Sequence, residues 1–309
     1  MSFSRKLIGR VLLCAGTGIA TAWLYRELFT SLILNHKTFA NRSLVGQAGI
    51  IIIGAAVVSL VTASLLFWSD SVPWRLIVFA APVLFFAFMF WMEQHREGLF
   101  EVVTAWEGPV EQVEETFLAL AAILLLVAAG RFAAQPRYMR WVVLVAGIGL
   151  LLLTGEEISW GQRIFHLALP QYFEAHNVQE ELNVHNLPVF ESWENDYHLL
   201  VGFIGALAWL VADLLARWTP RFRPLCNWIV PPWYMSLYFL PFGVTGIYFK
   251  VLVDPAFLGG LFAAWPHLLE ARRAYGYVEP GELLFAAGCL LVALHVLRLA
   301  GQKSQSLGS

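Results

Sequence analysis

The chain has 309 residues, of which 59% are hydrophobic and only 14% are charged, with a formal net charge of -2. Soluble domains carry about a quarter charged residues, so this composition excludes an ordinary soluble globular protein. The mean hydropathy of +0.65 is typical of a chain that lies mostly within a bilayer. The lipid bilayer is therefore the expected partner, and nothing in the charge balance indicates a nucleic acid.

Apolar stretches of about 20 residues, long enough to cross roughly 30 Å of hydrocarbon, recur along the chain. They predict an all-α, polytopic integral membrane helical bundle that forms a single domain over residues 1–309. We expect eight spans, near residues 11–34, 44–68, 74–92, 113–130, 141–158, 197–216, 233–252 and 283–299. Amphipathic or re-entrant segments are expected on the outer side, among them residues 254–276.

Charged residues are distributed unevenly among the expected loops. With a cytoplasmic N-terminus, 12 of the 20 Lys and Arg fall in short segments on the cytoplasmic side, whereas only Asp70 and Asp213 of the 22 acids do. The positive-inside rule favours this orientation. We therefore expect a multi-pass protein of the inner (plasma) membrane with both termini in the cytoplasm and the acids outside.

The most informative stretch is residues 154–166, at the end of the fifth expected span. Glu156 lies about 22 Å along the helix from Trp141, a depth still within the hydrocarbon. An ionisable residue there is costly and should face protein or a water-filled cavity. If the helix continues, one face carries Glu156, Ser159, Arg163 and His166. These four side chains predict either a substrate or ion site or a Glu–Arg pair that stabilises the helix end. Glu157 points about 100° away from this face of the helix.

A second polar stretch, residues 177–186, follows in the next loop. In an extended chain its alternate residues share a face, and in a helix Glu181 and His185 pair four residues apart. Both geometries give a strip of amides with an acid and an imidazole. The extended strip is Asn177, Gln179, Glu181, Asn183 and His185, and the helical face is His176, Gln179, Glu180, Asn183 and Asn186. Amides bind sugar hydroxyls and lipid head groups, and Glu with His can hold a divalent metal. A plain polar surface loop explains the same composition.

Acids also open the fourth and eighth expected spans, each time beside Gly and Pro. The two segments are residues 106–115 and residues 279–282. Acids suit the first turn of a helix because the helix dipole favours negative charge there. A relic of internal duplication, as in many transport folds, is the alternative.

The octapeptide Glu156-Glu-Ile-Ser-Trp-Gly-Gln-Arg163 and the following Asn177-x-Gln-x-Glu-x-Asn-x-His-Asn186 carry a resemblance. Over about 80 residues around these motifs, the chain resembles a group of uncharacterised bacterial multispanning membrane proteins. The resemblance implies a multispanning fold in a bacterial inner membrane. It implies no activity.

Three functions fit these observations. The first is an enzyme that acts on a lipid or lipid-linked glycan at the outer leaflet, with a divalent metal as a candidate cofactor. The second is a non-catalytic subunit or scaffold of an envelope complex. The third is an ion-coupled transporter, which is disfavoured because spans 44–68, 113–130 and 233–252 carry almost no charge in mid-membrane.

The enzyme hypothesis assigns roles to particular side chains. A general base, acid or metal ligand is expected among Glu156, Glu157, Ser159 and His185. Substrate binding is expected from Arg163, Gln162, Asn177, Gln179 and Asn183, where the guanidinium can hold a phosphate or carboxylate. If a divalent metal takes part, its expected ligands are Glu181 and His185.

Overall fold

The structure is a computed structural model that describes residues 72–105, 108–132, 137–177, 179–191, 193–219, 221, 226, 230–253 and 276–305. Within these ranges the chain is helical and contains no β-strand, in agreement with the predicted class. The long helices are α5 (Val72–His95), α7 (Pro109–Arg131), α8 (Arg137–Glu157), α12 (Glu194–Trp218), α14 (Ser236–Val253) and α17 (Val278–Gln305). The short elements are α6 (Glu97–Val103), η3 (Ser159–Gly161), α9 (Gln162–Phe165), α10 (Gln171–His176), α11 (Pro188–Glu191) and η5 (Trp233–Met235).

Five of the described helices are long and apolar enough to cross a membrane. They cover Pro73–His95, Pro109–Arg131, Arg137–Glu157, Asp196–Trp218 and Val278–Ala300. The seventh expected span, 233–252, corresponds to α14, which is not among these five. The expected spans 11–34 and 44–68 lie outside the described residues, as does almost all of the expected outer segment 254–276.

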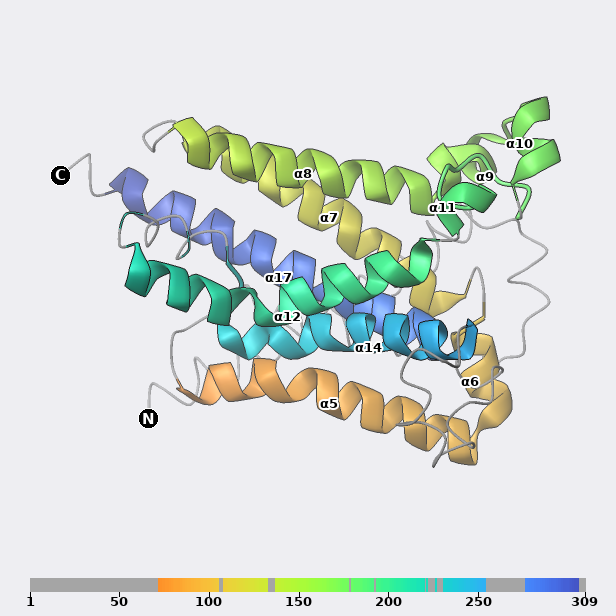
Figure 1. The fold of residues 1–309 in the computed structure, drawn as a ribbon, viewed down its shortest axis with the longest axis horizontal. Helices are drawn as coiled ribbons and strands as arrows, with labels where there is room; N and C mark the ends of the chain where they lie inside the picture. Colours follow the sequence, from red (N-terminus) through yellow and green to blue (C-terminus); the bar gives the residue numbers. More distant parts are fainter. Residues whose placement is uncertain are drawn as a thin grey trace, which may run out of the picture.

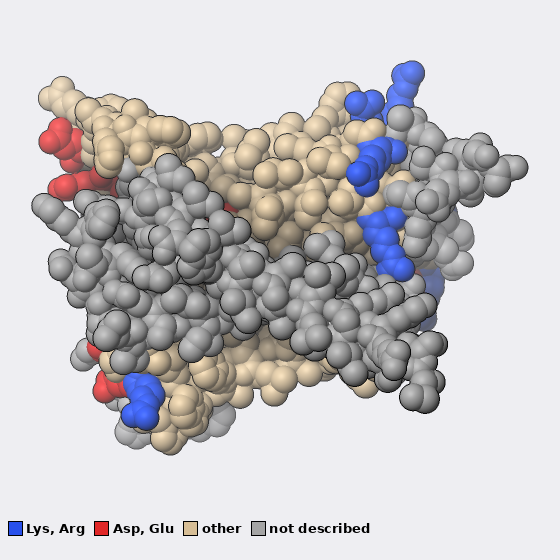
Figure 2. Space-filling model, turned by 180° about the vertical axis from the view of Figure 1, so that it is seen from behind, with Lys and Arg blue, Asp and Glu red and all other residues tan. Residues whose placement is uncertain are grey.

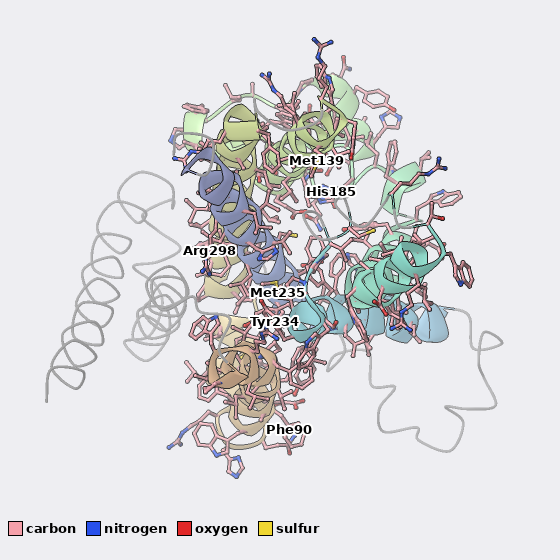
Figure 3. All side chains as sticks on the ribbon, turned by 90° about the vertical axis from the view of Figure 1, so that its left-hand side faces the viewer. Phe90, Met139, His185, Tyr234, Met235 and Arg298 are labelled. Atoms are coloured by element: carbon pink, nitrogen blue, oxygen red, sulfur yellow. The ribbon has the colours of Figure 1, made fainter. Side chains whose placement is uncertain are left out.

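Helix α17 forms the centre of the bundle (Figure 1). It packs along α7 on one side and α14 on another, while α8 covers α7 and α12 covers α14. Two thirds of the apolar window of α17 is buried, against 17% for α12 and 22% for α5. Figure 3 looks along the helices, with Met139 and Met235 buried in the bundle and Phe90 at its outside. The outer helices thus expose apolar side chains, as a protein surrounded by lipid does.

Small residues set the distance between α12 and α14. A Cβ atom on Gly202 would overlap the backbone of Gly243, and one on Gly205 would overlap the ring of Phe239. The two helices therefore approach more closely than side chains would allow. Such contacts between small residues are a common device of membrane helix packing, where van der Waals contact replaces the hydrophobic effect.

Charges gather at the two ends of the bundle. Figure 2 shows the basic side chains of this face at one end and the acids at the other, with one basic side chain near the acids. We call the end with the N-terminal turns of α7 and α17 and the C-terminal turn of α8 the acidic end, and the opposite one the basic end. Residues of the basic end include Arg131, Arg137, Arg140, Arg217 and Arg298. The segregation expected from the sequence is therefore present in the described part of the fold.

Candidate functional site at the acidic end

Helix α8 ends at Glu157, and the chain then makes a left-handed reversal. Ser159, Trp160 and Gly161 have φ angles of 48°, 51° and 76°. The left-handed region costs a residue with a Cβ atom roughly 1–2 kcal/mol, so contacts elsewhere must stabilise this turn. One such contact is visible: the ring of Trp160 lies against Gly155, where an added Cβ atom would meet the ring at 2.9 Å.

This reversal corrects one prediction. The expected helical column of Glu156, Ser159, Arg163 and His166 does not form, because the helix stops before Ser159. His166 is exposed and itself has a φ of 52°, and the side chain of Arg163 lies outside the described part. The competing interpretation, a Glu–Arg pair along one helix face, loses its geometric basis together with the column.

Ser159 instead joins a buried hydrogen-bond network with the second polar stretch. Its side chain is fully buried, and its Oγ donates to Glu181 Oε2 at 2.9 Å. The same carboxylate oxygen accepts from Asn183 Nδ2 at 2.7 Å and lies 3.4 Å from Asn186 Nδ2. Three neutral donors thus face one oxygen of the buried Glu181 carboxyl group.

The amides of residues 177–186 are used inside the loop. Asn177 Nδ2 donates to the backbone and side-chain oxygens of Asn183, and Asn177 Oδ1 accepts from the backbone nitrogens of Gln179 and Glu181. Gln162 Oε1 accepts from the backbone nitrogen of Leu182. The segment is neither the extended chain nor the helix considered above, and its amides do not form an open strip for a sugar. They fold the loop onto the end of α8.

Glu156 connects α8 to the same loop. Its Oε1 accepts from Trp160 Nε1 at 2.7 Å, and its Oε2 accepts from the backbone nitrogens of Val184 and His185 at 2.6 and 3.1 Å. His185 Nδ1 lies 3.6 Å from Glu156 Oε2, too far for a hydrogen bond. Burial lowers the pKa of the His185 imidazole from its usual range, an effect that the charge of Glu156 only partly offsets. His185 is therefore favoured as a neutral imidazole.

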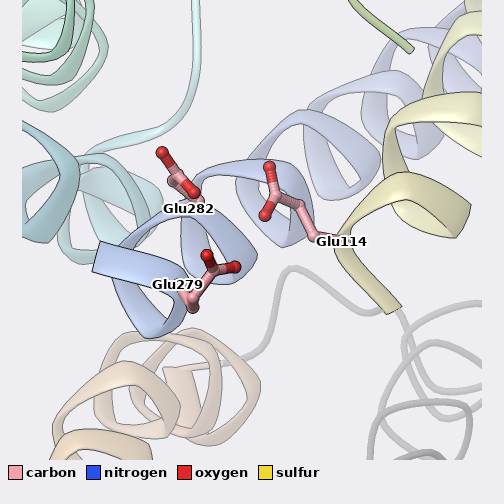
Figure 4. A group of neighbouring side chains, drawn as sticks. All are labelled: Glu114, Glu279 and Glu282. Atoms are coloured by element: carbon pink, nitrogen blue, oxygen red, sulfur yellow. The ribbon is translucent and has the colours of Figure 1, made fainter. Parts of the chain in front are cut away.

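A second group of acids lies at the same end of the bundle. Glu114 of α7 and Glu279 and Glu282 of α17 each offer a carboxylate oxygen, and these oxygens lie within 4.8 Å of one another. Figure 4 shows the three side chains pointing toward one another from two neighbouring helices. We call them the glutamate cluster. Glu157 is close enough for its charge to act on both Glu114 and Glu279, which brings a residue predicted from the sequence to the edge of this cluster.

A third helix supplies an imidazole to the cluster. His198 of α12 is 1% exposed, and its Nε2 lies 3.3 Å from Glu282 Oε1 and 2.9 Å from the hydroxyl of Tyr197. Its ring packs against Phe242, with the ring centres 4.3 Å apart. The charges of Glu282 and His198 both act on His185, so the loop described above lies beside the cluster.

The glutamate cluster was missed in the sequence, where its acids were interpreted as first-turn residues of two helices. That interpretation is correct for Glu279, since α17 begins at Val278, but it does not explain why Glu114 is buried. A usable signal was present: Glu111-x-x-Glu114 and Glu279-x-x-Glu282 share a spacing of three residues, which puts both acids of a pair on one helix face. Nothing in the sequence shows that the two faces meet.

The predicted site residues therefore separate into two groups. Most of them build the loop, namely Glu156, Ser159, Gln162, Asn177, Gln179, Glu181 and Asn183. Glu157 and His185 lie where the loop meets the glutamate cluster. Glu181 and His185 were expected as metal ligands, but the group with ligand oxygens in reach of a common ion, among the described residues, is Glu114, Glu279 and Glu282.

The chain was also compared with known proteins. A scan against protein-family models, a search of curated proteins and a search of solved structures each find no match.

Proposed function

We propose that this chain is an integral membrane enzyme of the bacterial plasma membrane that acts on a lipid or lipid-linked glycan in the outer leaflet. The acidic end would then face the non-cytoplasmic side. The observation that supports this most is the convergence of Glu114, Glu279 and Glu282 with His198 inside the bundle. Ionisable groups buried at this depth are costly, and proteins keep them chiefly where they are used.

Burial argues for chemistry over a scaffold. A docking surface needs side chains that a partner can reach, whereas Glu114 is 5% exposed and His198 is 1% exposed. The charge pattern argues against transport. Between Thr116 and Gly130 α7 has no charged residue, and α17 has none between Leu283 and Leu294, so no relay of charged groups leads from the cluster to the basic end along these helices.

The surroundings of the cluster support a substrate that arrives from the bilayer. Large apolar and aromatic side chains of the loop segments are exposed at the acidic end, beside the short helices α9, α10 and α11 (Figure 1). They include Trp160, Phe165, Tyr172, Phe190 and Trp193. Aromatic side chains of this kind settle at the level of lipid head groups. A substrate with a lipid anchor would present its head group at that level, next to the loop.

In the proposed reaction His185 acts as the general base. It is 36% exposed, and its neutral form carries a lone pair that can accept a proton from water or from a substrate hydroxyl. Glu156 positions it by accepting its backbone N–H. The carboxyl groups of the cluster, on the inner side of the loop, supply the acid partner or hold the group that activates water. The reaction class is hydrolysis or group transfer at the head group.

The test uses purified full-length protein in vesicles of a bacterial polar lipid extract, with lipid products followed by mass spectrometry. The wild type and Glu174→Gln, which removes an exposed acid of the same end, should convert a lipid species. His185→Asn and Glu282→Gln should lower the rate by about a hundredfold or more, the usual contribution of a general acid or base. Full turnover by His185→Asn would refute the assignment of the base. A wild type that converts no lipid would refute the proposed substrate class.

A further inference from the structure

We infer that the glutamate cluster, together with His198, binds one divalent transition-metal ion. The carboxylate oxygens of Glu114, Glu279 and Glu282 lie within 4.8 Å of one another. Carboxylate oxygens lie about 2.0–2.2 Å from an ion such as Zn²⁺, so two ligands of one ion are at most roughly 4.4 Å apart. The three oxygens therefore need to close by at most a few tenths of an ångström or so around a common ion. They come from two neighbouring helices that pack against each other (Figure 4).

The hydrogen bonding of the cluster gives a second, independent reason. Glu114 is 5% exposed, so its carboxyl group is largely shielded from water. Glu279 Oε2 is buried and has no hydrogen-bond partner in the part of the chain that the structure describes. One oxygen from each cluster glutamate thus faces the other two carboxyl groups, and Glu282 Oε1 also faces His198 Nε2.

Charge strengthens the case. Burial is the largest influence on the carboxyl groups of Glu114 and Glu279, and the charges that act on them next are other carboxylates, first Glu282 in both cases. The ion pairs of the described residues include none between a cluster glutamate and a Lys or Arg. Several acids that repel one another inside a bundle are stabilised either by protons or by a cation among them, and a bound divalent cation supplies two positive charges.

His198 narrows the choice of ion. Its Nε2 faces Glu282 Oε1 at 3.3 Å from a third helix, and Phe242 and Tyr197 pack against its ring, so the nitrogen is held in a fixed direction. Three carboxylates and one imidazole suit Mn²⁺, Fe²⁺ or Zn²⁺ better than Ca²⁺ or Mg²⁺, which favour oxygen ligands alone, or Cu⁺, which favours sulfur. The binding of the ion does not depend on the proposed function, whereas a catalytic role for it rests on that function.

With such an ion, the enzyme proposed above gains a way to activate water. A divalent ion lowers the pKa of a bound water toward neutrality and so provides a nucleophile at ordinary pH. His185, beside the cluster on the loop, is then placed to take the proton. The ion would also offset the repulsion among Glu114, Glu157, Glu279 and Glu282.

Binding is tested on the full-length protein in detergent. The protein is treated with a chelator, desalted, titrated with MnCl₂ or ZnCl₂ alone, desalted again and analysed for metal by mass spectrometry. The wild type should retain about one ion per chain and unfold at a higher temperature with it, since a ligand that binds only the folded state stabilises it. Glu114→Gln and Glu282→Gln should lower the affinity at least tenfold, while Glu174→Gln and His185→Asn should bind as the wild type does.

A spectroscopic readout separates ligation from a structural role. Mn²⁺ bound through His198 Nε2 should show nitrogen hyperfine coupling in electron spin echo spectra, and His198→Gln should remove the coupling. Wild-type protein that retains no ion, or cluster variants that bind as the wild type does, would overturn the inference. Lipid turnover without metal would refute a catalytic role for the ion and leave the proposed enzyme standing. Metal binding without turnover would support the site and count against the enzyme.

Discussion

Glu156 offers the sharpest test of the idea that the loop is a folded support beside the site. The substitution Glu156→Ala removes the acceptor for three donors at once: Trp160 Nε1 and the backbone nitrogens of Val184 and His185. It leaves the glutamate cluster itself untouched. We expect residues 177–187 to loosen while the metal affinity of the cluster stays within a factor of two or so of the wild type.

The size of the effect follows from the geometry. A hydrogen bond to a charged acceptor contributes about 1.5–3 kcal/mol, and losing it leaves a donor to be satisfied by water. Val184 is exposed and Trp160 is half exposed, so water can replace much of what they lose. The hydrogen bond from the His185 backbone nitrogen is partly buried, so water can replace less of it than of the other two. The expected local destabilisation is therefore about 2 kcal/mol, or roughly a 30-fold change in the opening equilibrium.

Amide hydrogen exchange measures this opening directly. The amides of Val184 and His185 should exchange roughly 30-fold faster in Glu156→Ala than in the wild type, whereas amides in the middle of α7 should not change. Glu156→Gln is the matched control, because it keeps an oxygen acceptor without the charge and should lie between the two. Equal exchange at Val184 and His185 in all three proteins would refute the claim that Glu156 holds the loop.

Three further predictions concern packing, the buried network and pH. Gly202→Ala should lower the unfolding temperature in detergent, with a cost of about 1–3 kcal/mol from overpacking against α14, whereas Gly149→Ala in an open position of α8 should be neutral or slightly stabilising. Ser159→Ala should cost about 1–3 kcal/mol in reversible unfolding, because Glu181 loses a buried donor while the backbone requirement is unchanged. Because burial lowers the pKa of His185, the unfolded chain binds more protons near and below pH 6.5 or so, and stability should fall as the pH drops through that range. His185→Asn should flatten that part of the thermal stability profile, and an unchanged profile would contradict it.

Much of the fold could be predicted from the sequence because the bilayer imposes a simple rule. A span must satisfy its own backbone polar groups, so long apolar runs become helices and little else is possible. The described helices α5, α7, α8, α12 and α17 follow the predicted spans closely for this reason. The asymmetry of charge could likewise be predicted, since most acids fall at one set of span ends and many basic residues at the other.

The candidate site could be predicted only in part, for two physical reasons. The left-handed conformations of Ser159 and Trp160 are locally unfavourable and exist because tertiary contacts stabilise them. A prediction from helical periodicity cannot include such contacts, so it extended the helix, and the face with Glu156 and Ser159, beyond Glu157. The glutamate cluster depends on which helices are neighbours. Which helices are neighbours depends on packing details such as the small residues between α12 and α14. A hydropathy profile does not predict these neighbours.

The pairing of α7 with α17 has a consequence for how the protein is made. Glu114 and Glu279 meet in space although 165 residues separate them along the chain, which corresponds to roughly ten to thirty seconds of synthesis. During that interval α7 is in the membrane while the surface that α17 will cover is still bare. The glutamate cluster can therefore form only after α17 has been made. A chain that stops before residue 278 carries Glu114 and His198 but lacks Glu279 and Glu282, so it has only half of the proposed metal ligands.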